Sequence, residues 1–340
     1  MAPDRFHHVA NGSSTTGLIE AAGLAGTRSI WADVLYEGPV PGGLTDAQLL
    51  DVRERFLAGP AGVSTTVWRG RNVTLDPAND LHEWRTAIAR HESYGELVLW
   101  FEHDLFDQLN LIQLLPWIRE HLPPSKPVSL ICIDSFPGRP GFKGLGELTP
   151  AELASLLDSR ERVDEAQHAL AGRAWQAFRQ PAPEALDQLR RSDTSALPYL
   201  AAATTRFLQE YPWTIDGLSR SERRLLDLAR HGRMALSTAF PQMHAGERDY
   251  YITDASLAEL ADSLSVTLPS LLTLDAGSRH ENALQRTIAL TDIGRAVLAG
   301  QLDRVATCGI DRWYGGAHLQ GKNGIWRWDD TRQRMTRGFP

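Results

Sequence analysis

The first 147 residues alternate short apolar runs with longer segments of helical periodicity, and this alternation constrains the fold more than any other feature. The apolar runs predict strands at Phe6–Val9, Arg28–Ala32, Val63–Trp68, Leu97–Phe101 and Val128–Ile133. The segments between them predict helices at Thr15–Ala22, Thr45–Ala58, Leu81–His91 and Leu105–Glu120. Strands that alternate with helices form a mostly parallel sheet, so we expect an α/β fold.

Two further regions follow the predicted sheet. Residues 148–217 lack strand-like runs and are rich in Ala, Leu, Arg and Glu, which predicts an all-α region. From residue 218 a capped helix, a second helix and two short strands around a polar tip follow in an order that resembles a winged helix. The sequence thus predicts an α/β ligand-binding domain at 1–147, a helical region at 148–217, and a winged-helix-like region with a Trp/Arg-rich tail at 218–340.

Composition limits the classes of protein that the chain can represent. Its 340 residues are 42% hydrophobic and 23% charged, as in a packed globular protein. No apolar run approaches the roughly 20 residues of a membrane span, and no apolar targeting core follows Met1–Arg5, so we expect a cytoplasmic protein without membrane contact. The net charge of −7 argues against a chain coated by nucleic acid but allows a local basic face. The two cysteines form no disulfide or zinc pattern.

Polar residues directly follow the first predicted strand. In open α/β sheets ligands bind beyond the carboxyl ends of the strands. Here His8, Asn11, Gly12 and Ser13 lie at such an end and lead into a helix, whose N-terminal N–H groups favour a phosphate or carboxylate. These four residues are therefore predicted to bind a ligand. A plain turn with Ser or Thr capping explains the same segment.

Polar residues also follow two other predicted strands. Asp33 and Glu37 come after the second strand and would reach the same edge of the sheet as Asn11. Asp134 ends the fifth strand, and Lys143 lies in the glycine-rich loop beyond it, where it can supply a positive charge to a ligand. Solvated turn carboxylates and a flexible linker are the alternatives.

The densest polar segment is WFEHDLFDQ, residues 100–108. Asp104 precedes an apolar helical stripe and is a natural N-cap, and Asp107 falls in the first turn, where acids are favoured. Glu102 and His103 come before the helix begins, and strand alternation points them to opposite sides. We expect one of them, preferably His103, to act as a general base or metal ligand, with a structural histidine as the alternative. A divalent metal is compatible with these residue types, although no metal motif enforces it.

Several segments resemble one uncharacterised bacterial family. They are HHVANGSS, WADVLYEGPVP, LWFEHDLFDQL, GFKGLGELTPAEL and GIDRWYGGAHL, spread over nearly the whole chain. On these motifs the chain is similar to the bacterial family defined by the domain of unknown function numbered 1835, and this resemblance implies no activity. Leu218–Gly232 also resembles the helix-turn-helix of sigma-factor region 4.

Two hypotheses follow. The first is an enzyme, a hydrolase or transferase, that acts on a phosphorylated or nucleotide-like small molecule, with His103, Glu102, Glu37 and Asp33 as acid/base or metal groups. The second is a DNA-binding regulator that contacts DNA through residues 218–300 and senses a ligand with the α/β domain; its motivation is the polar wing carrying Arg279 and Arg286. The winged-helix-like region is also compatible with a packing or dimerisation role, and the chain with a homo-oligomer.

Overall fold

The computed structural model describes residues 4–58, 64–68, 71–75, 77–275 and 283–338. The chain divides into two compact units. Unit 1 comprises Met1–Pro181, Leu189–Ala201 and Gly315–Ala317, and unit 2 comprises Ala182–Gln188, Ala202–Tyr314 and His318–Pro340. The helices expected between residues 148 and 217 are therefore divided between the units. Over the described ranges, no helix has the length and apolar character needed to cross a membrane.

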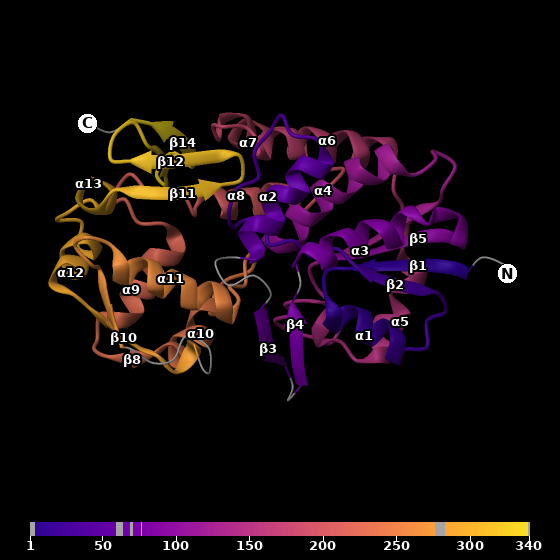
Figure 1. Cartoon of the computed structure of the whole chain (residues 1–340), viewed down its shortest axis with the longest axis horizontal. Coiled ribbons are helices and arrows are strands. Elements are labelled where there is room, and N and C mark those ends of the chain that lie inside the picture. The colour runs from indigo at the N-terminus through magenta and orange to yellow at the C-terminus, as the bar shows by residue number, and fades with distance from the viewer. Residues whose placement is uncertain (1–3, 59–63, 69–70, 76, 276–282, 339–340) are drawn as a thin grey trace. The chain divides into compact units, whose positions relative to one another are not determined.

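Unit 1 contains a five-stranded sheet (Figure 1). Its strands are β1 (Asp4–Ala10), β2 (Thr27–Ile30), β5 (Tyr94–Glu102), β6 (Val128–Ile133) and β7 (Glu161–Arg162). They lie in the order β2-β1-β5-β6-β7, and only the pairing of β6 with β7 is antiparallel. This mostly parallel sheet, with helices in the middle of the chain, confirms the predicted α/β fold class.

Helices cover both faces of this sheet. They are α1 (Ser13–Ala21), α2 (Asp46–Ala58), α3 (Pro77–Ala89), α4 (Leu105–His121), α5 (Pro150–Ser155) and α6 (Glu165–Phe178). Figure 1 shows α1 and α5 on one side of the strands and α3 and α4 on the other. Thr45 and Gln48 form a reciprocal pair before α2. The predicted N-cap of α4 is confirmed, because the Asp104 side chain accepts a hydrogen bond from the Asp107 N–H at 2.9 Å.

The strand predicted at Val63–Trp68 is confirmed as β3 (Ser64–Trp68), and Val63 lies outside the described residues. β3 pairs antiparallel with β4 (Arg71–Leu75) as a separate hairpin, so its expected place in the parallel sheet was wrong. An apolar run indicates a strand but not its partner. A tight antiparallel connection needs only a few residues, whereas a parallel crossover needs a dozen or more.

The order of the strands reverses at β1. The chain passes from β1 to β2 on one side and returns as β5 on the other side of β1. The connections after β1 and β5 therefore leave in opposite directions, and in open α/β sheets such a reversal marks the crevice where ligands bind, beyond the carboxyl ends of the two strands. A core cluster that includes residues of β1, α1, β5 and β6 contains Ile19, Val98, Trp100 and Ile131, all at most 2% exposed.

Helix α4 holds the segment that follows β2. The Asp33 N–H donates to Asn110 Oδ1 at 2.9 Å, and Asn110 Nδ2 donates back to the Asp33 carbonyl at 2.9 Å. One turn further along α4, Gln113 Oε1 accepts from Trp31 Nε1 at 2.9 Å. Buried amides with such complete pairing fix the loop after β2 against the helix.

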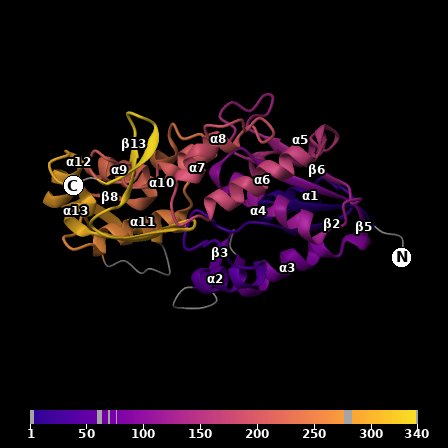
Figure 2. The same cartoon turned by 90° about the horizontal axis from the view of Figure 1, so that it is seen from above.

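The remaining helices lie mainly in unit 2. They are α7 (Glu184–Leu189), α8 (Leu200–Leu208), α9 (Arg220–Ala229), α10 (Leu236–His244), α11 (Asp254–Val266), α12 (Asp292–Leu298) and α13 (Arg304–Cys308), several of which are seen from above in Figure 2. A small antiparallel sheet has the order β8 (Met234–Ala235), β10 (Thr287–Leu290), β9 (Leu272–Leu274). Two hairpins complete the chain, β11 (Ile310–Tyr314) with β12 (Ala317–Gly321) and β13 (Trp326–Asp329) with β14 (Arg334–Arg337).

The Trp/Arg-rich tail is tied into unit 2. The Trp328 N–H donates to the Pro212 carbonyl at 2.9 Å, and the Thr214 N–H donates to the Trp328 carbonyl at 3.0 Å. Trp328 is fully buried, and Arg327 forms a 2.7 Å ion pair with Asp303. These contacts account for Trp328 and Arg327 as packing residues.

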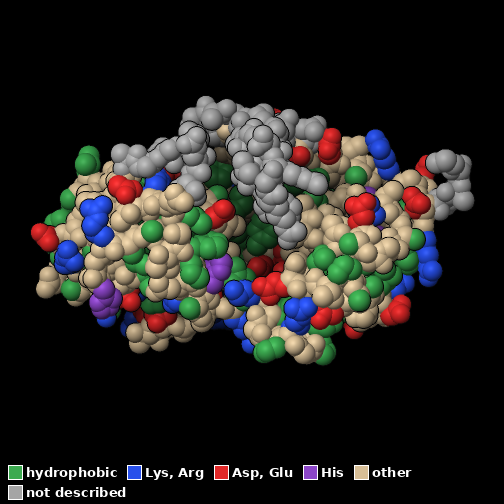
Figure 3. Space-filling view, turned by 90° about the horizontal axis from the view of Figure 1, so that it is seen from below, with side chains coloured by type: hydrophobic (Ala, Val, Ile, Leu, Met, Phe, Trp, Pro, Cys, Tyr) green, Lys and Arg blue, Asp and Glu red, His purple; other side chains and the backbone are tan. Residues whose placement is uncertain are grey.

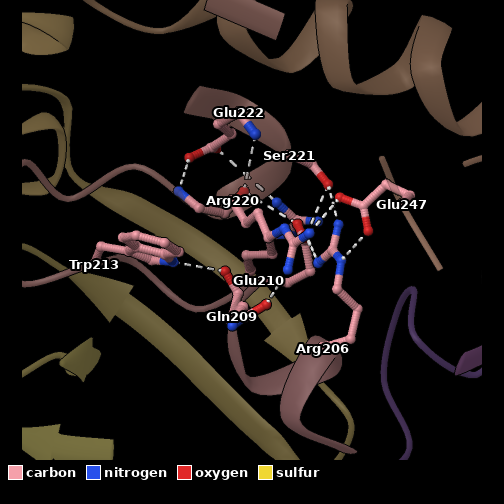
Figure 4. A network of polar contacts seen from close by, with 10 residues as sticks. Arg206, Gln209, Glu210, Trp213, Arg220, Ser221, Glu222 and Glu247 are labelled. Carbon is pink, nitrogen blue, oxygen red and sulfur yellow. Dashed lines mark hydrogen bonds and ion pairs between the residues drawn. The ribbon is translucent and has the colours of Figure 1, made fainter. Parts of the chain in front are cut away.

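A buried ionic network also organises unit 2 (Figure 4). Arg206 on α8 is 3% exposed and pairs with Glu210 and, at 3.1 Å, with Glu247. Glu210 also accepts hydrogen bonds from Ser219 Oγ at 3.1 Å and Ser221 Oγ at 2.7 Å. Because every charge in this set has an opposite charge or a donor, its burial is tolerated.

We expect Asn110→Ala to lower the free energy of unfolding by about 2–4 kcal/mol, because it leaves the buried Asp33 N–H and carbonyl without partners. Urea unfolding followed by circular dichroism measures the loss. Gln176→Ala on the exposed face of α6 is the control. Equal stabilities of the two variants would show that these hydrogen bonds do not hold the loop.

Candidate functional site

The end of β1 contributes Asn11 to the crevice beyond β1 and β5. Asn11 Nδ2 donates to both carboxylate oxygens of Asp107 at 3.0 Å, and Asn11 Oδ1 accepts from Thr15 Oγ1 at 3.0 Å. Gly12 is the N-cap of α1, where no side chain caps the helix, and Ser13 is exposed. The ligand-binding segment predicted from the sequence therefore lies at the crevice, with Asn11 fixed from inside the protein.

The end of β5 contributes Glu102. Its Oε1 accepts from the Leu145 N–H at 2.5 Å, and its own N–H donates to Asp107 Oδ2 at 2.5 Å. A Cβ added at Gly144 would clash with Glu102 Oε2, so a larger residue at this position in the loop after β6 would displace the carboxylate. Three segments distant in sequence thus enclose one carboxylate.

Burial determines the electrostatics of this cluster. Glu102 is 5% exposed and Asp107 fully buried. Desolvation, followed by the nearby charge of Asp104, raises the pKa of Glu102 to about 8. Desolvation and then the charge of Glu102 raise the pKa of Asp107 well above its ordinary value. At neutral pH the Glu102–Asp107 pair therefore retains a proton, which a carboxyl group exposed to water would have lost.

His103 and Asp104 lie at the turn between β5 and α4. His103 is 2% exposed, and its ring meets that of Tyr199 edge-on, with centroids 6.1 Å apart. Asp104 is the helix N-cap. The proposed acid/base role of His103 stays a prediction.

Asp33 and Glu37 lie in the loop after β2. Asp33 forms a buried bidentate pair with Arg53, at 2.7 Å to Nη2 and 2.9 Å to Nε. The Glu37 carbonyl accepts from Arg53 Nη1 at 2.6 Å. The described contacts link Asp33 to the Glu102–Asp107 pair through α4, where Asn110 and Asp107 lie one turn apart. The Arg53 contact accounts for Asp33 as a structural residue, and its predicted chemical role has no direct support.

The remaining three predicted ligand-binding residues, His8, Asp134 and Lys143, have contacts different from those of Asn11. His8 is fully buried; its Nδ1 accepts from Trp100 Nε1 at 3.1 Å, and its Nε2 lies 3.3 Å from the Ala25 carbonyl. Asp134 accepts from Ser135 Oγ at 3.0 Å, and Lys143 is exposed in the loop that also carries Gly144. The contacts of His8 are those of a core histidine.

Comparisons with known proteins add no relative, because no protein-family model and no curated protein matches the chain. The resemblance to the family of domain 1835 thus stays a prediction. Among residues 4–58, 64–68, 71–75, 77–275 and 283–338, no three or more His, Cys, Asp or Glu side chains are grouped so that they could hold a metal ion.

Sequence reasoning missed the importance of Asp107. The local pattern explains it as an acid in the first turn of a helix, yet its carboxylate binds Asn11 and the backbone of Glu102. The available signal was its position: it follows the predicted strand end at Phe101 by only six residues, on a helix that is buried on nearly every side. An acid on such a helix must be buried with partners.

The raised pKa of Glu102 predicts that the protein loses stability as pH rises. The unfolded chain releases this proton near pH 4.5, whereas the folded chain keeps it to about pH 8, so the free energy of unfolding falls between these values. His7, whose pKa desolvation lowers to about 4, changes stability only below about pH 6.5. The window from pH 6.5 to 8 therefore reports on the Glu102–Asp107 pair without His7.

We expect the wild type to lose up to about 2 kcal/mol between pH 6.5 and 8, and Glu102→Gln to lose less than half as much. Urea unfolding at several pH values measures both slopes. Glu165→Gln, which changes a carboxylate whose side chain is 73% exposed, should keep the wild-type slope. A Glu102→Gln slope equal to that of the wild type would contradict the assignment.

Proposed function

We propose that the protein is an enzyme, a hydrolase or transferase, that acts on a phosphorylated or nucleotide-like small molecule beyond the carboxyl ends of β1 and β5. The observation that supports this most is the buried Glu102–Asp107 pair at the point where the strand order reverses. Perturbed carboxyl groups cluster at catalytic sites because proton transfer near neutral pH needs a pKa near the working pH.

Each residue in the crevice has a distinct role in this proposal. As water or an acceptor hydroxyl attacks the phosphorus, protonated Glu102 donates its proton to the leaving oxygen of the substrate, and the proton of the attacking group passes to the transferred phosphate. Asp107 is held by Asn11. It keeps Glu102 protonated, because two adjacent carboxylates would repel each other. The uncapped first turn of α1, which contains no acidic side chain, offers N–H groups to the phosphate of the substrate.

The enclosure of Glu102 implies that the loop after β6 moves in each cycle. Leu145 donates to the Glu102 carboxylate and, with Gly144, separates it from solvent. Gly138 and Gly141 have φ values of 79° and 74°, so this loop contains two backbone positions that only glycine adopts freely. A substrate would replace the Leu145 N–H as the partner of Glu102.

We expect the protein to bind AMP or ribose 5-phosphate and to release phosphate from, or transfer it between, such compounds. Glu102→Gln should retain binding but lower the turnover number about 10²–10⁴-fold, because an amide cannot transfer a proton to the leaving oxygen. Isothermal titration measures binding, and ³¹P NMR measures turnover. Wild-type activity should fall as pH rises through about 8. Glu165→Gln is the control; full activity in Glu102→Gln would refute the proposed role.

DNA binding by residues 218–300 is the second candidate. The order helix, strand, two helices, two strands, with β8 paired to the last strand, supports a winged-helix-like arrangement. Its charges oppose DNA contact. α11, the helix that would enter a groove, contains no Lys or Arg, and Arg286 is 4% exposed and paired with Asp262 at 2.8 Å. Arg279 lies outside the described residues. Figure 3 shows basic side chains scattered among acidic ones on the face it presents.

We therefore expect the full chain to bind a duplex of random sequence no more tightly than about 10⁻⁴ M at 50 mM salt, because α11, the helix that would enter the groove, supplies no Lys or Arg for phosphate contacts. Fluorescence anisotropy of labelled DNA measures this. Salt-dependent binding in the micromolar range would favour the regulator over the enzyme.

A further inference from the structure

Unit 1 contains a cleft at the free edge of its sheet. Its volume is about 460 Å³, within the range of clefts that bind small molecules. Its lining comes from three elements: α1, the edge strand β2 and α3. Figures 1 and 2 agree in placing β2 between α1 and α3. The cleft thus wraps around the exposed edge of β2.

The cleft lies next to the segment that contributes Asn11 to the carboxylate site, which is formed by Glu102 and Asp107. Ser13, the first residue of α1, is part of its lining. Ser13 is two residues from Asn11, so their Cα atoms are at most about 7.6 Å apart. The cleft therefore ends at the start of α1, close to the residue that binds Asp107.

The charges of the lining disfavour phosphate groups inside the cleft itself. Its charged side chains are Arg28, Glu20 and Glu83. Arg28 is already paired with Glu20 at 3.3 Å, so the sum of the three charges is negative. The part of a ligand that occupies the cleft should therefore be neutral. Carboxylates accept hydrogen bonds from hydroxyl groups, such as those of a ribose.

The rest of the lining suits a flat polar ring. Trp84 on α3 is half-buried and supplies an aromatic surface. Bases stack on such side chains with little dependence on sequence. Ser29, near the carboxyl end of β2, also lines the cleft, with its Oγ 2.8 Å from His7 Nε2. β2 is an edge strand, so one side of its backbone faces away from the sheet and can meet the polar edge of a base.

We propose that this cleft binds the nucleoside part of a nucleotide, with the base against Trp84, the ribose hydroxyls near Glu83 or Glu20, and the phosphate beyond Ser13 at the carboxylate site. This inference rests on the proposed function and narrows it: the substrate is a nucleotide, and its phosphate, not its base, meets Glu102. The cleft supplies specificity, and the crevice supplies chemistry.

The test compares four probes on the full chain by isothermal titration and ligand-observed NMR: AMP, adenosine, ribose 5-phosphate and inorganic phosphate. AMP should bind at least tenfold more tightly than ribose 5-phosphate, and Trp84→Ala should abolish this difference. Trp84→Phe, which retains an aromatic ring, should preserve at least part of it. Trp175→Ala, which removes another half-buried tryptophan outside the cleft, should retain all of it.

The outcomes separate this inference from the function on which it rests. If AMP and ribose 5-phosphate bind equally, or Trp84→Ala keeps the preference for AMP while remaining folded by circular dichroism, the nucleoside cleft is refuted and a phosphorylated sugar remains as substrate. If adenosine binds and Trp84→Ala abolishes this binding, but AMP binds no more tightly than adenosine, the nucleoside cleft is supported and the phosphate site is refuted. Absence of binding by all four probes refutes both.

Discussion

The fold of unit 1 depends on polar side chains of the buried helix α4. Asp107 holds Asn11 and the backbone of Glu102, Asn110 holds the segment after β2, and Gln113 holds Trp31. These positions are three residues apart, so they form one polar stripe along the helix. A buried amide or carboxyl group without partners destabilises a fold. Helix α4 can therefore be buried only when the strand ends lie where they can bond its polar side chains. The crevice is thus shaped by the same bonds that stabilise the sheet.

This arrangement concentrates electrostatic strain at one place. Asn110 and Gln113 are neutral, whereas Asp107 lies beside Glu102, and burial of both would confine two like charges at low dielectric. Retaining a proton relieves the repulsion, but the free energy of unfolding then falls as pH rises. In the buried Asp33–Arg53 pair, by contrast, opposite charges compensate each other. A stabilising role alone would be served better by an amide at position 102. The retained carboxyl group therefore favours a chemical role for Glu102.

Local rules predicted the elements of this sheet but not their long-range partners. Periodicity predicted the four parallel strands, and capping chemistry predicted Asp104, because both depend on residues close in sequence. The same local rule gave Asp107 a sufficient explanation and so concealed its contact with Asn11, which lies 96 residues away. Asp33 was singled out because it follows a strand, but only the structure reveals Arg53 as its partner. Burial and partner, which determine chemistry, are properties of the assembled sheet.

Shape and charge lead to different conclusions in the two units. In unit 2, α11 has no Lys or Arg and Arg286 is used internally, so the proposed winged-helix arrangement carries no function without the charges that would perform it. In unit 1 the strand reversal is equally common to many folds, but there the adjoining residues match the position: Asn11 and the Glu102–Asp107 pair lie at the reversal, and the lining of the cleft begins at Ser13, two residues after Asn11. The agreement of topology with local chemistry is what supports placing the proposed function in unit 1.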